Sequence, residues 1–93
     1  MIYIDNYEGW FKGKKYCHMI ADSTEELVAF AKRLGLKEQW IQNRGKGNEH
    51  FDVVWSKRDT ALLYGAKELT AYELATITFE RLRMQNKIKQ EEL

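Results

Sequence analysis

Three helix-start signals divide this sequence, and each follows a short apolar run that is typical of a β-strand. The signals are Ser23-Thr24-Glu25-Glu26, Ser56-Lys57-Arg58-Asp59 and Thr70-Ala71-Tyr72-Glu73. In each signal the hydroxyl can accept a hydrogen bond from the first helical turn, and the carboxylate three residues later can accept one from the backbone of the cap. Strands that alternate with helices restrict the chain to α/β architectures.

The expected helix ends agree with these starts. Apolar residues recur at helical spacing over residues 27–34, and Gly35 then supplies a left-handed cap. Gly65 closes the helix that begins at Ser56 in the same way. The third helix is expected over residues 71–89 and has no glycine stop.

The expected strands and their order define the fold class. Four strand-like runs accompany the helices, at residues 2–4, 16–21, 51–55 and 67–69. A turn between Gly9 and Gly13 joins the first two runs, and residues 42–49 form the clearest loop. The order β-β-α-β-α-β-α predicts an α/β fold with a small, mainly parallel sheet and three helices, because strand–helix–strand connections normally place the strands in parallel.

The length and composition fit one folded domain. The chain has 93 residues, of which 44% are hydrophobic, and this is too apolar for intrinsic disorder. We therefore expect a single domain over residues 1–93, in which residues 83–93 form a polar helical tail. The single cysteine, Cys17, excludes an internal disulfide, and no apolar run approaches the length of a membrane span. These features predict a cytoplasmic domain without a membrane partner.

The charge of the chain is balanced overall but unevenly distributed. A net charge of +1 gives no general attraction to nucleic acid or anionic lipid, so nucleic acid is disfavoured as a partner. Residues 12–67 nevertheless hold 11 basic and 7 acidic side chains. If the fold gathers these cations around one cleft, the cleft attracts an anion; otherwise they form a solvated face.

The first candidate site is the basic corner, which consists of Ser56, Lys57 and Arg58. In open α/β folds, ligands bind beyond the carboxyl ends of the strands, where helix N-termini point N–H groups at anions. Two cations in the first turn of a helix oppose its dipole at a cost of a few tenths of a kcal/mol, up to about 1 kcal/mol. That cost favours an anion-binding role. The alternative is that both side chains extend into solvent while Asp59 closes the capping box.

The second candidate site combines the two histidines with nearby carboxylates, in His18-x3-Asp22 and His50-x-Asp52. Alternation along a strand places His50 and Asp52 on the face opposite Phe51. If the two strands are neighbours, His18 approaches His50 or Asp52. Such a cluster can bind a divalent metal or act as acid and base, although neither spacing matches a recognised metal motif. The alternative is a polar network that fixes the strand register.

Several spaced segments together resemble a known family. They are the opening Met-Ile-Tyr-Ile-Asp, the segments His18–Asp22 and His50–Asp52, the helix Glu25–Leu36, Trp40, and Ser56-Lys57-Arg58 followed by Gly65-Ala66. Over roughly Met1 to Leu69 the chain resembles a family of small, uncharacterised bacterial and phage proteins classed as a domain of unknown function. The resemblance supplies no mechanism, and it points to His18, Asp22, His50, Asp52, Lys57 and Arg58.

These candidates support three functions. In the first, the chain is a small binding domain that holds a phosphorylated, nucleotide-like molecule at the basic corner, with Asp22, Arg44 and Trp40 as further contacts. In the second, it is a metal-dependent or histidine-based hydrolase or phosphoesterase that uses His18, Asp22, His50 and Asp52. In the third, it is a structural or protein-interaction module. The residues identify no cofactor. Imidazoles that open onto a cleft beside Lys57 and Arg58 would favour catalysis.

The third helix is a candidate surface for a homodimer. Met84 and Ile88 continue the apolar stripe that Leu74 and Ile77 begin, and a domain of 93 residues has little sheet left to cover them. A symmetric dimer is the commonest way to cover such a stripe. The alternative is a solvated tail.

Overall fold

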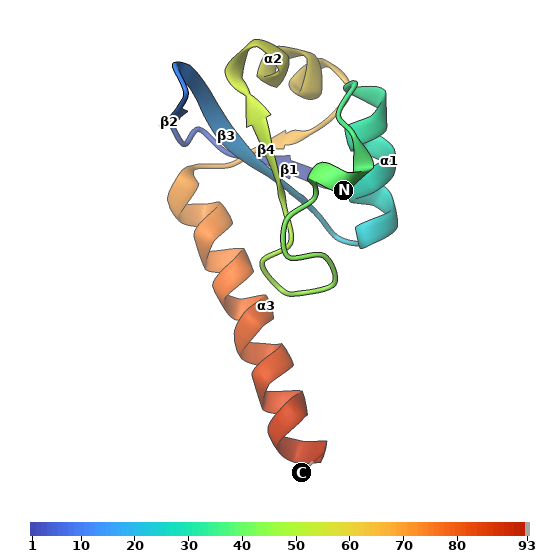
Figure 1. Ribbon diagram of the computed structural model, residues 1–93. Helices are drawn as coiled ribbons and strands as arrows, with labels where there is room; N and C mark the ends of the chain where they lie inside the picture. The colour runs from blue at the N-terminus through green and yellow to red at the C-terminus, as the bar shows by residue number, and fades with distance from the viewer. Residues whose placement is uncertain (93) are drawn as a thin grey trace.

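One mixed sheet of five strands forms the centre of the fold (Figure 1). The computed structural model describes the backbone of residues 1–92 and the side chains of residues 1–88. The long strand β3 is central: it pairs with β1 and β2 along one side and with β4 along the other, and β5 lies beyond β1. The strands are β1 (Ile2–Ile4), β2 (Gly9–Phe11), β3 (Lys14–Ala21), β4 (Phe51–Val54) and β5 (Lys67–Glu68).

The expectation of a mainly parallel sheet is wrong. Strand β3 is antiparallel to β1, β2 and β4, and β1 with β5 is the parallel pair among the described strands. The cause is the connection that follows α1 (Thr24–Arg33). There, residues 34–50 pass through the short 3₁₀ helix η1 (Glu38–Trp40) and bring the chain back to the end of the sheet at which β3 stops. Strand β4 therefore starts opposite Met19 and runs back along β3.

Two further features of the sheet bear on the expected order of elements. Strands β4 and β5, which α2 (Trp55–Leu63) connects, are parallel to each other as expected, because both run antiparallel to β3. The sequence pattern does not predict β2, which forms a hairpin with β3. Its turn uses Lys12 at φ 50° and Gly13 at φ 77°, so it falls within the segment where a turn is expected.

Two of the three expected hydroxyl caps are confirmed, and the complete capping box forms at Thr70, whose N–H also donates to Glu73 at 2.9 Å. At the start of α1, Ser23 Oγ accepts a hydrogen bond from the backbone N–H of Glu26 at 3.2 Å. At the start of α3 (Ala71–Glu92), Thr70 Oγ1 accepts one from the backbone N–H of Glu73 at 3.1 Å. The glycines that follow α1 and α2 both have positive φ, as a left-handed cap requires.

The third capping box, at Ser56, is wrong. Helix α2 begins one residue earlier, after Val54, and no side chain caps it. The Trp55 indole N–H donates to the carbonyl of Tyr7 at 3.0 Å. Because this contact holds Trp55 in the first helical turn, Ser56 lies past the cap position and is exposed.

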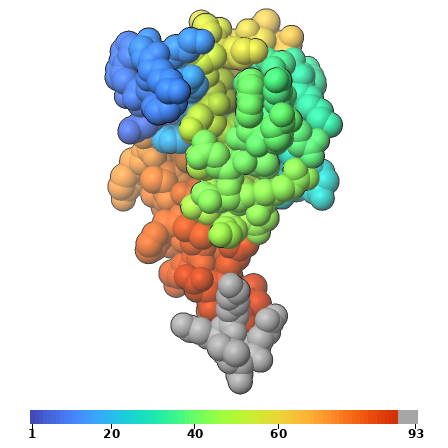
Figure 2. All heavy atoms as spheres, viewed as in Figure 1, coloured from blue at the N-terminus to red at the C-terminus, as the bar shows by residue number. Residues whose placement is uncertain are grey.

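The loop of residues 42–49, confirmed as a loop, is tied to the rest of the fold. Two backbone hydrogen bonds between Gln42 and His50, at 2.9 and 3.1 Å, close its base. The loop lies against α3 (Figure 2). There the Gln85 side chain accepts from the N–H of Gly47 at 2.7 Å and donates to the carbonyl of Gly45 at 3.2 Å. These contacts position the start of β4.

The helices cover the two faces of the sheet unequally. Helices α1 and α2 pack on one face over Met19, Phe51 and Val53, which are completely buried. On the other face α3 packs Leu74 against Ile20, and it then continues past the body of the protein (Figure 1). Within the described residues, no helix is both long enough and apolar enough to cross a membrane. The result is a single α/β domain with part of one sheet face left open beside α3.

Candidate functional site

Strands β3 and β4 bring the two histidines together on the face that α3 partly covers. In the antiparallel register His18 lies opposite Asp52, and His50 immediately precedes β4. Because residues two apart share a face of a strand, His50 and Asp52 project to the same side. The imidazole rings of His18 and His50 meet edge to face, with centroids 5.6 Å apart. The expected approach of His18 to this pair is confirmed.

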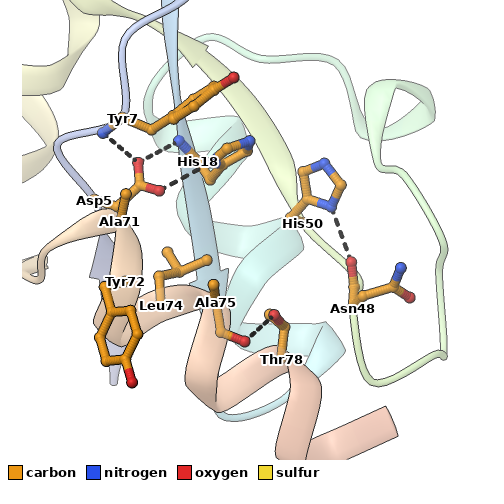
Figure 3. Close-up of a pocket in the computed structure, with 10 residues that line it drawn as sticks. All are labelled: Asp5, Tyr7, His18, Asn48, His50, Ala71, Tyr72, Leu74, Ala75 and Thr78. Atoms are coloured by element: carbon orange, nitrogen blue, oxygen red, sulfur yellow. Dashed lines mark hydrogen bonds and ion pairs between the residues drawn. The ribbon is translucent and has the colours of Figure 1, made fainter.

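Both imidazoles line one cavity of about 480 Å³ between the sheet and the first half of α3 (Figure 3). Asn48 lines this two-histidine cavity, and its buried side-chain oxygen, Oδ1, has no hydrogen-bond partner among the described residues. The residues around the cavity are mostly aromatic, apolar or uncharged polar: Asp5, Tyr7, His18, Asn48, His50, Ala71, Tyr72, Leu74, Ala75 and Thr78.

A buried carboxylate orients His18. Asp5 directly follows β1 and is 1% exposed. Its Oδ1 accepts from the backbone N–H of His18 at 2.8 Å and of Tyr7 at 3.2 Å, and its Oδ2 lies 2.8 Å from His18 Nδ1. Because a carboxylate only accepts, neutral His18 carries its proton on Nδ1 and keeps a lone pair on Nε2.

The surroundings of His18 leave that lone pair available. The Tyr7 ring stacks on the imidazole at a centroid distance of 4.7 Å, which fixes the plane of the ring. Among the described residues, none forms a hydrogen bond with Nε2. His18 therefore combines an oriented ring with a free basic nitrogen, the arrangement that a general base requires.

His50 also lies beside a carboxylate, but the contact is at its other ring nitrogen. Its Nδ1 lies 2.9 Å from the carbonyl of Asn48, and its Nε2 lies 3.4 Å from Asp52 Oδ1. The hydrogen bond with Asp52 raises the pKa of His50 above its ordinary value, and burial opposes this. The same bond lowers the pKa of the Asp52 carboxyl, which also accepts from Gln42 at 2.7 Å. His50 is thus held toward its protonated form, in which both ring nitrogens donate.

The basic corner lies outside the two-histidine cavity, and its cations have partners within the chain. Lys57 Nζ donates to the carbonyl of Leu34, the C-terminal cap of α1, at 2.7 Å. Arg58 is 6% exposed. Its Nε donates to the backbone carbonyl of Asp5 at 2.9 Å, and its Nη2 pairs with Glu68 at 2.6 Å. Arg58 therefore holds the end of β1 from which Asp5 projects.

The other expected ligand contacts are dispersed over the surface. Asp22 lies 3.4 Å from the N-terminal amino group and 3.6 Å from Arg81 of α3. Arg44 pairs with a glutamate of η1 at 3.0 Å, Trp40 is exposed on η1, and Ser56 is exposed on α2. None of these four residues lines the two-histidine cavity. Of the expected site residues, the structure brings together His18, His50 and Asp52.

The sequence patterns do not predict three parts of the site: Asp5, Tyr7 and the side of the cavity formed by α3. The one sequence signal for Asp5 is its position: a carboxylate directly after a short strand, in the opening segment that carries the family resemblance. Its distance to His18 depends on the pairing of β1 with β3, which local patterns do not determine. For α3, the sequence indicates an apolar face and gives no indication that this face borders a cavity.

Two further observations concern metal binding and the single thiol, Cys17. Within the described side chains, no group of three or more His, Cys, Asp or Glu residues is arranged to hold a metal ion. Cys17 is completely buried, and burial raises its pKa to about 12. Its Sγ lies 3.5 Å from the carbonyl of Val53. Cys17 therefore packs as a small apolar side chain.

Comparison with known families covers most of the chain. A family model described as a protein of unknown function, DUF4031, matches residues 2–81. The match extends past Leu69 and contains every residue that lines the two-histidine cavity. No curated protein and no solved structure matches the chain. The chain therefore belongs to the DUF4031 family of proteins of unknown function.

Proposed function

We propose that this protein is a hydrolase that uses histidine acid–base catalysis in the two-histidine cavity. The observation that carries the proposal is the pairing of unlike imidazoles: His18 is positioned by Asp5 with a free nitrogen, and His50 is held toward its charged form by Asp52. Their rings lie 5.6 Å apart at one cavity of about 480 Å³. That volume falls within the range of roughly 300–1,000 Å³ typical of small-molecule sites.

In the proposed reaction each histidine moves one proton. His18 Nε2 accepts a proton from a water molecule as the water oxygen attacks the substrate, and Asp5 stabilises the imidazolium that forms. His50 donates its Nε2 proton to the leaving group as the bond to it breaks. This N–H leaves its 3.4 Å contact with Asp52 to do so, because Nδ1 stays bound to the carbonyl of Asn48. Exchange with solvent then returns both imidazoles to their starting states. Asp52 contributes by keeping His50 protonated before the reaction.

The geometry supports this function better than binding of a phosphorylated molecule at the basic corner. Lys57 and Arg58 donate to backbone carbonyls, and Arg58 also pairs with Glu68. A phosphate at this corner would have to replace those contacts. The imidazoles do open onto one cavity, but Lys57 and Arg58 do not line it. A cytoplasmic location stays a prediction.

Substitution of each histidine tests the proposal directly. The chain contains two histidines, and both line the cavity. We expect His18→Gln and His50→Gln each to lower kcat/KM on a responsive reporter ester by about 100-fold, within the usual range for acid–base groups. Arg44→Gln, a change at an exposed ion pair far from the cavity, serves as the control. If both histidine variants fold and keep full activity, the polar network has only a structural role.

We also propose that the end of α3 pairs with a second copy of the chain. Leu74 packs against the sheet, whereas Met84 and Ile88 are 50% and 52% exposed. Glu80 and Lys87 flank Met84 along the helix. In an antiparallel pair centred between Arg83 and Met84, Glu80 of each copy lies opposite Lys87 of the other, and opposite charges beside an apolar seam favour this arrangement.

A further inference from the structure

The charges around the two-histidine cavity are already balanced within the chain. Among the residues whose side chains are described, no lysine or arginine lines the cavity. The positively charged group at the cavity is His50, which is paired with Asp52. The Asp5 carboxylate forms hydrogen bonds with the His18 ring and with the backbone N–H groups of His18 and Tyr7. The guanidinium of Arg58, which contacts the backbone of Asp5, is also bound to Glu68. Among the described residues, an anionic ligand would therefore meet the Asp5 carboxylate and no unpaired Lys or Arg side chain.

A phosphate in such a site would lose its hydration without gaining a charged partner. Burial of an uncompensated charge is far more costly than burial of a neutral polar group that finds a hydrogen bond. Sites that bind phosphoryl groups in proteins supply Arg, Lys or several backbone N–H groups for this reason. The charge balance of the cavity thus favours an uncharged ligand.

The walls of the cavity suit a flat apolar group. Helix α3 contributes Leu74 and Ala75, which give the cavity an aliphatic side. Two tyrosines stand on either side: Tyr7, stacked on His18, and Tyr72, near the start of α3, are 47% and 81% exposed (Figure 3). Exposed aromatic rings at a cavity can pack against a second ring in offset or edge-to-face geometry.

We infer that the substrate is an uncharged ester or amide that carries a flat apolar group. The inference rests on the proposed hydrolase function and specifies its substrate class. The flat group lies against Leu74, Ala75 and the tyrosines, which places the carbonyl beside the imidazoles. The water oxygen bonds to the carbonyl carbon while His18 takes the water proton. The bond from that carbon to the leaving oxygen or nitrogen breaks, and the proton from His50 completes the leaving group, so no oxidant or reductant takes part.

Three reporters with the same leaving group test the substrate class. They are 4-nitrophenyl acetate, which is neutral, and 4-nitrophenyl phosphate and bis(4-nitrophenyl) phosphate, which are anionic. We expect the wild-type chain to cleave the acetate with a kcat/KM about 100-fold above that of His18→Gln, and to cleave neither phosphate ester above the rate of that variant. Cleavage of a phosphate ester that depends on His18, without cleavage of the acetate, overturns the inference and leaves the hydrolase function standing.

A charge introduced into the wall gives a second, independent readout. Ala75 lines the cavity and is exposed, whereas Thr76 is its exposed neighbour outside the cavity. If the cavity lacks only a cation for phosphate, Ala75→Lys should gain binding of phenyl phosphate, seen as shifts of the two histidine ring signals by NMR. Thr76→Lys should gain none. Wild-type binding of phenyl phosphate at least as tight as that of Ala75→Lys contradicts the charge argument.

A ligand that does not react separates the inference from the function it rests on. Acetophenone, a neutral aryl ketone with no hydrolysable bond, should shift the ring signals of both histidines in the wild-type chain, and phenyl phosphate at the same concentration should not. Acetophenone binding without ester turnover overturns catalysis and supports the ligand class. Absence of both binding and turnover overturns the inference and the proposed function together.

Discussion

At the scale of single residues, the two histidines are proposed to act differently, one as a base and one as an acid, because different atoms contact their rings. Asp5 accepts the Nδ1 proton of His18 and leaves Nε2 unpaired, whereas Asp52 sits beside Nε2 of His50 and favours the charged ring. A carboxylate therefore orients each ring, but it does so through a different ring nitrogen in the two histidines. The proposed division of labour follows from this contrast.

Asp52→Asn should change the pH dependence of activity and of stability. Because Asp52 raises the pKa of His50, its loss should move the alkaline fall in kcat/KM to lower pH. For stability, a raised His50 pKa contributes in full below the ordinary imidazole pKa and is lost as the pH rises through the raised value. A lowered Asp52 pKa contributes above the ordinary carboxyl pKa and is lost as the pH falls through the lowered value.

The wild-type advantage over Asp52→Asn should therefore be largest between the ordinary carboxyl and imidazole pKa values, and it should be lost beyond the two shifted values of this coupled pair. Urea unfolding of both chains across the pH range measures it, with a pH–rate profile run in parallel. A stability difference that is constant with pH contradicts the pairing of His50 with Asp52.

Arg58 is predicted to act on stability through the backbone of Asp5. Arg58→Met keeps much of the apolar stem but removes the donors to the Asp5 carbonyl and to Glu68. We expect a loss of about 1–3 kcal/mol in the free energy of unfolding, since a buried acceptor loses its partner. Arg44→Met, which breaks an exposed ion pair, should cost no more than about 1 kcal/mol. Equal losses from the two changes would count against a buried positioning role for Arg58.

The sequence predicts the His50–Asp52 pair but not the partners of the basic corner. Strand alternation alone places His50 and Asp52 on one face, and that placement is local. The partners of Lys57 and Arg58 are Leu34, Asp5 and Glu68, which lie in other elements. A local pattern shows that two cations begin a helix and cannot show that the fold uses them internally.

At the scale of elements, the loop of residues 42–49 depends on its contact with α3. A Cβ atom at Gly47 would lie 2.5 Å from the backbone nitrogen of Leu82 and 2.6 Å from the carbonyl carbon of Arg81. The absence of a side chain thus allows the loop to approach the helix. Gln85 secures the approach through two hydrogen bonds. This contact fixes the position of His50, which directly precedes β4.

Gly47→Ala should therefore destabilise the protein and displace His50. The added methyl group meets backbone atoms that cannot rotate away, and overpacking of this kind costs roughly 1–3 kcal/mol. We expect a lower urea midpoint and a lower kcat/KM on the reporter ester. Lys46→Ala, an exposed neighbour in the same loop, should leave both nearly unchanged. A Gly47→Ala chain as stable and active as the wild type would show that the loop adjusts freely.

The sheet shows how far element order predicts topology. Helix starts at Ser23 and Thr70 come from local capping chemistry, and the structure has both. The direction of β4 depends instead on how residues 34–50 return the chain to the end of β3. Nothing in the spacing of strands and helices encodes that return. For this reason the elements are predictable and the mixed sheet is not.

At the scale of the whole molecule, one long helix produces both the cavity and an unpaired surface. The first half of α3 covers part of the sheet and walls the two-histidine cavity. Its second half extends past the sheet in a molecule of 45 × 25 × 24 Å (Figure 1). The exposed Met84 and Ile88 lie on that extension.

Self-association through α3 can be tested without shortening the chain. Truncation after Arg83 would remove Gln85 and its bonds to the loop, so Met84→Ser with Ile88→Ser is the cleaner change. We expect sedimentation equilibrium to show a dimer for the wild type and a monomer for the double variant. Phe79→Ser alters another exposed apolar residue of α3 and should remain dimeric. A monomeric wild type, or a double variant that still dimerises, contradicts the proposed interface.

The central claim is that His18 and His50 work as one acid–base unit, and a double-mutant cycle tests it most directly. The measurement is kcat/KM on phenyl acetate, whose phenolate leaving group gains from protonation more than 4-nitrophenolate does, for the wild type, His18→Gln, His50→Gln and the double variant. Near-ultraviolet circular dichroism confirms folding of each chain. Each single change should lower kcat/KM by about 100-fold, and the double variant should lose little more, because residues that act together are not additive. Folded single variants within twofold of the wild type, or losses that multiply in the double variant, would contradict the account.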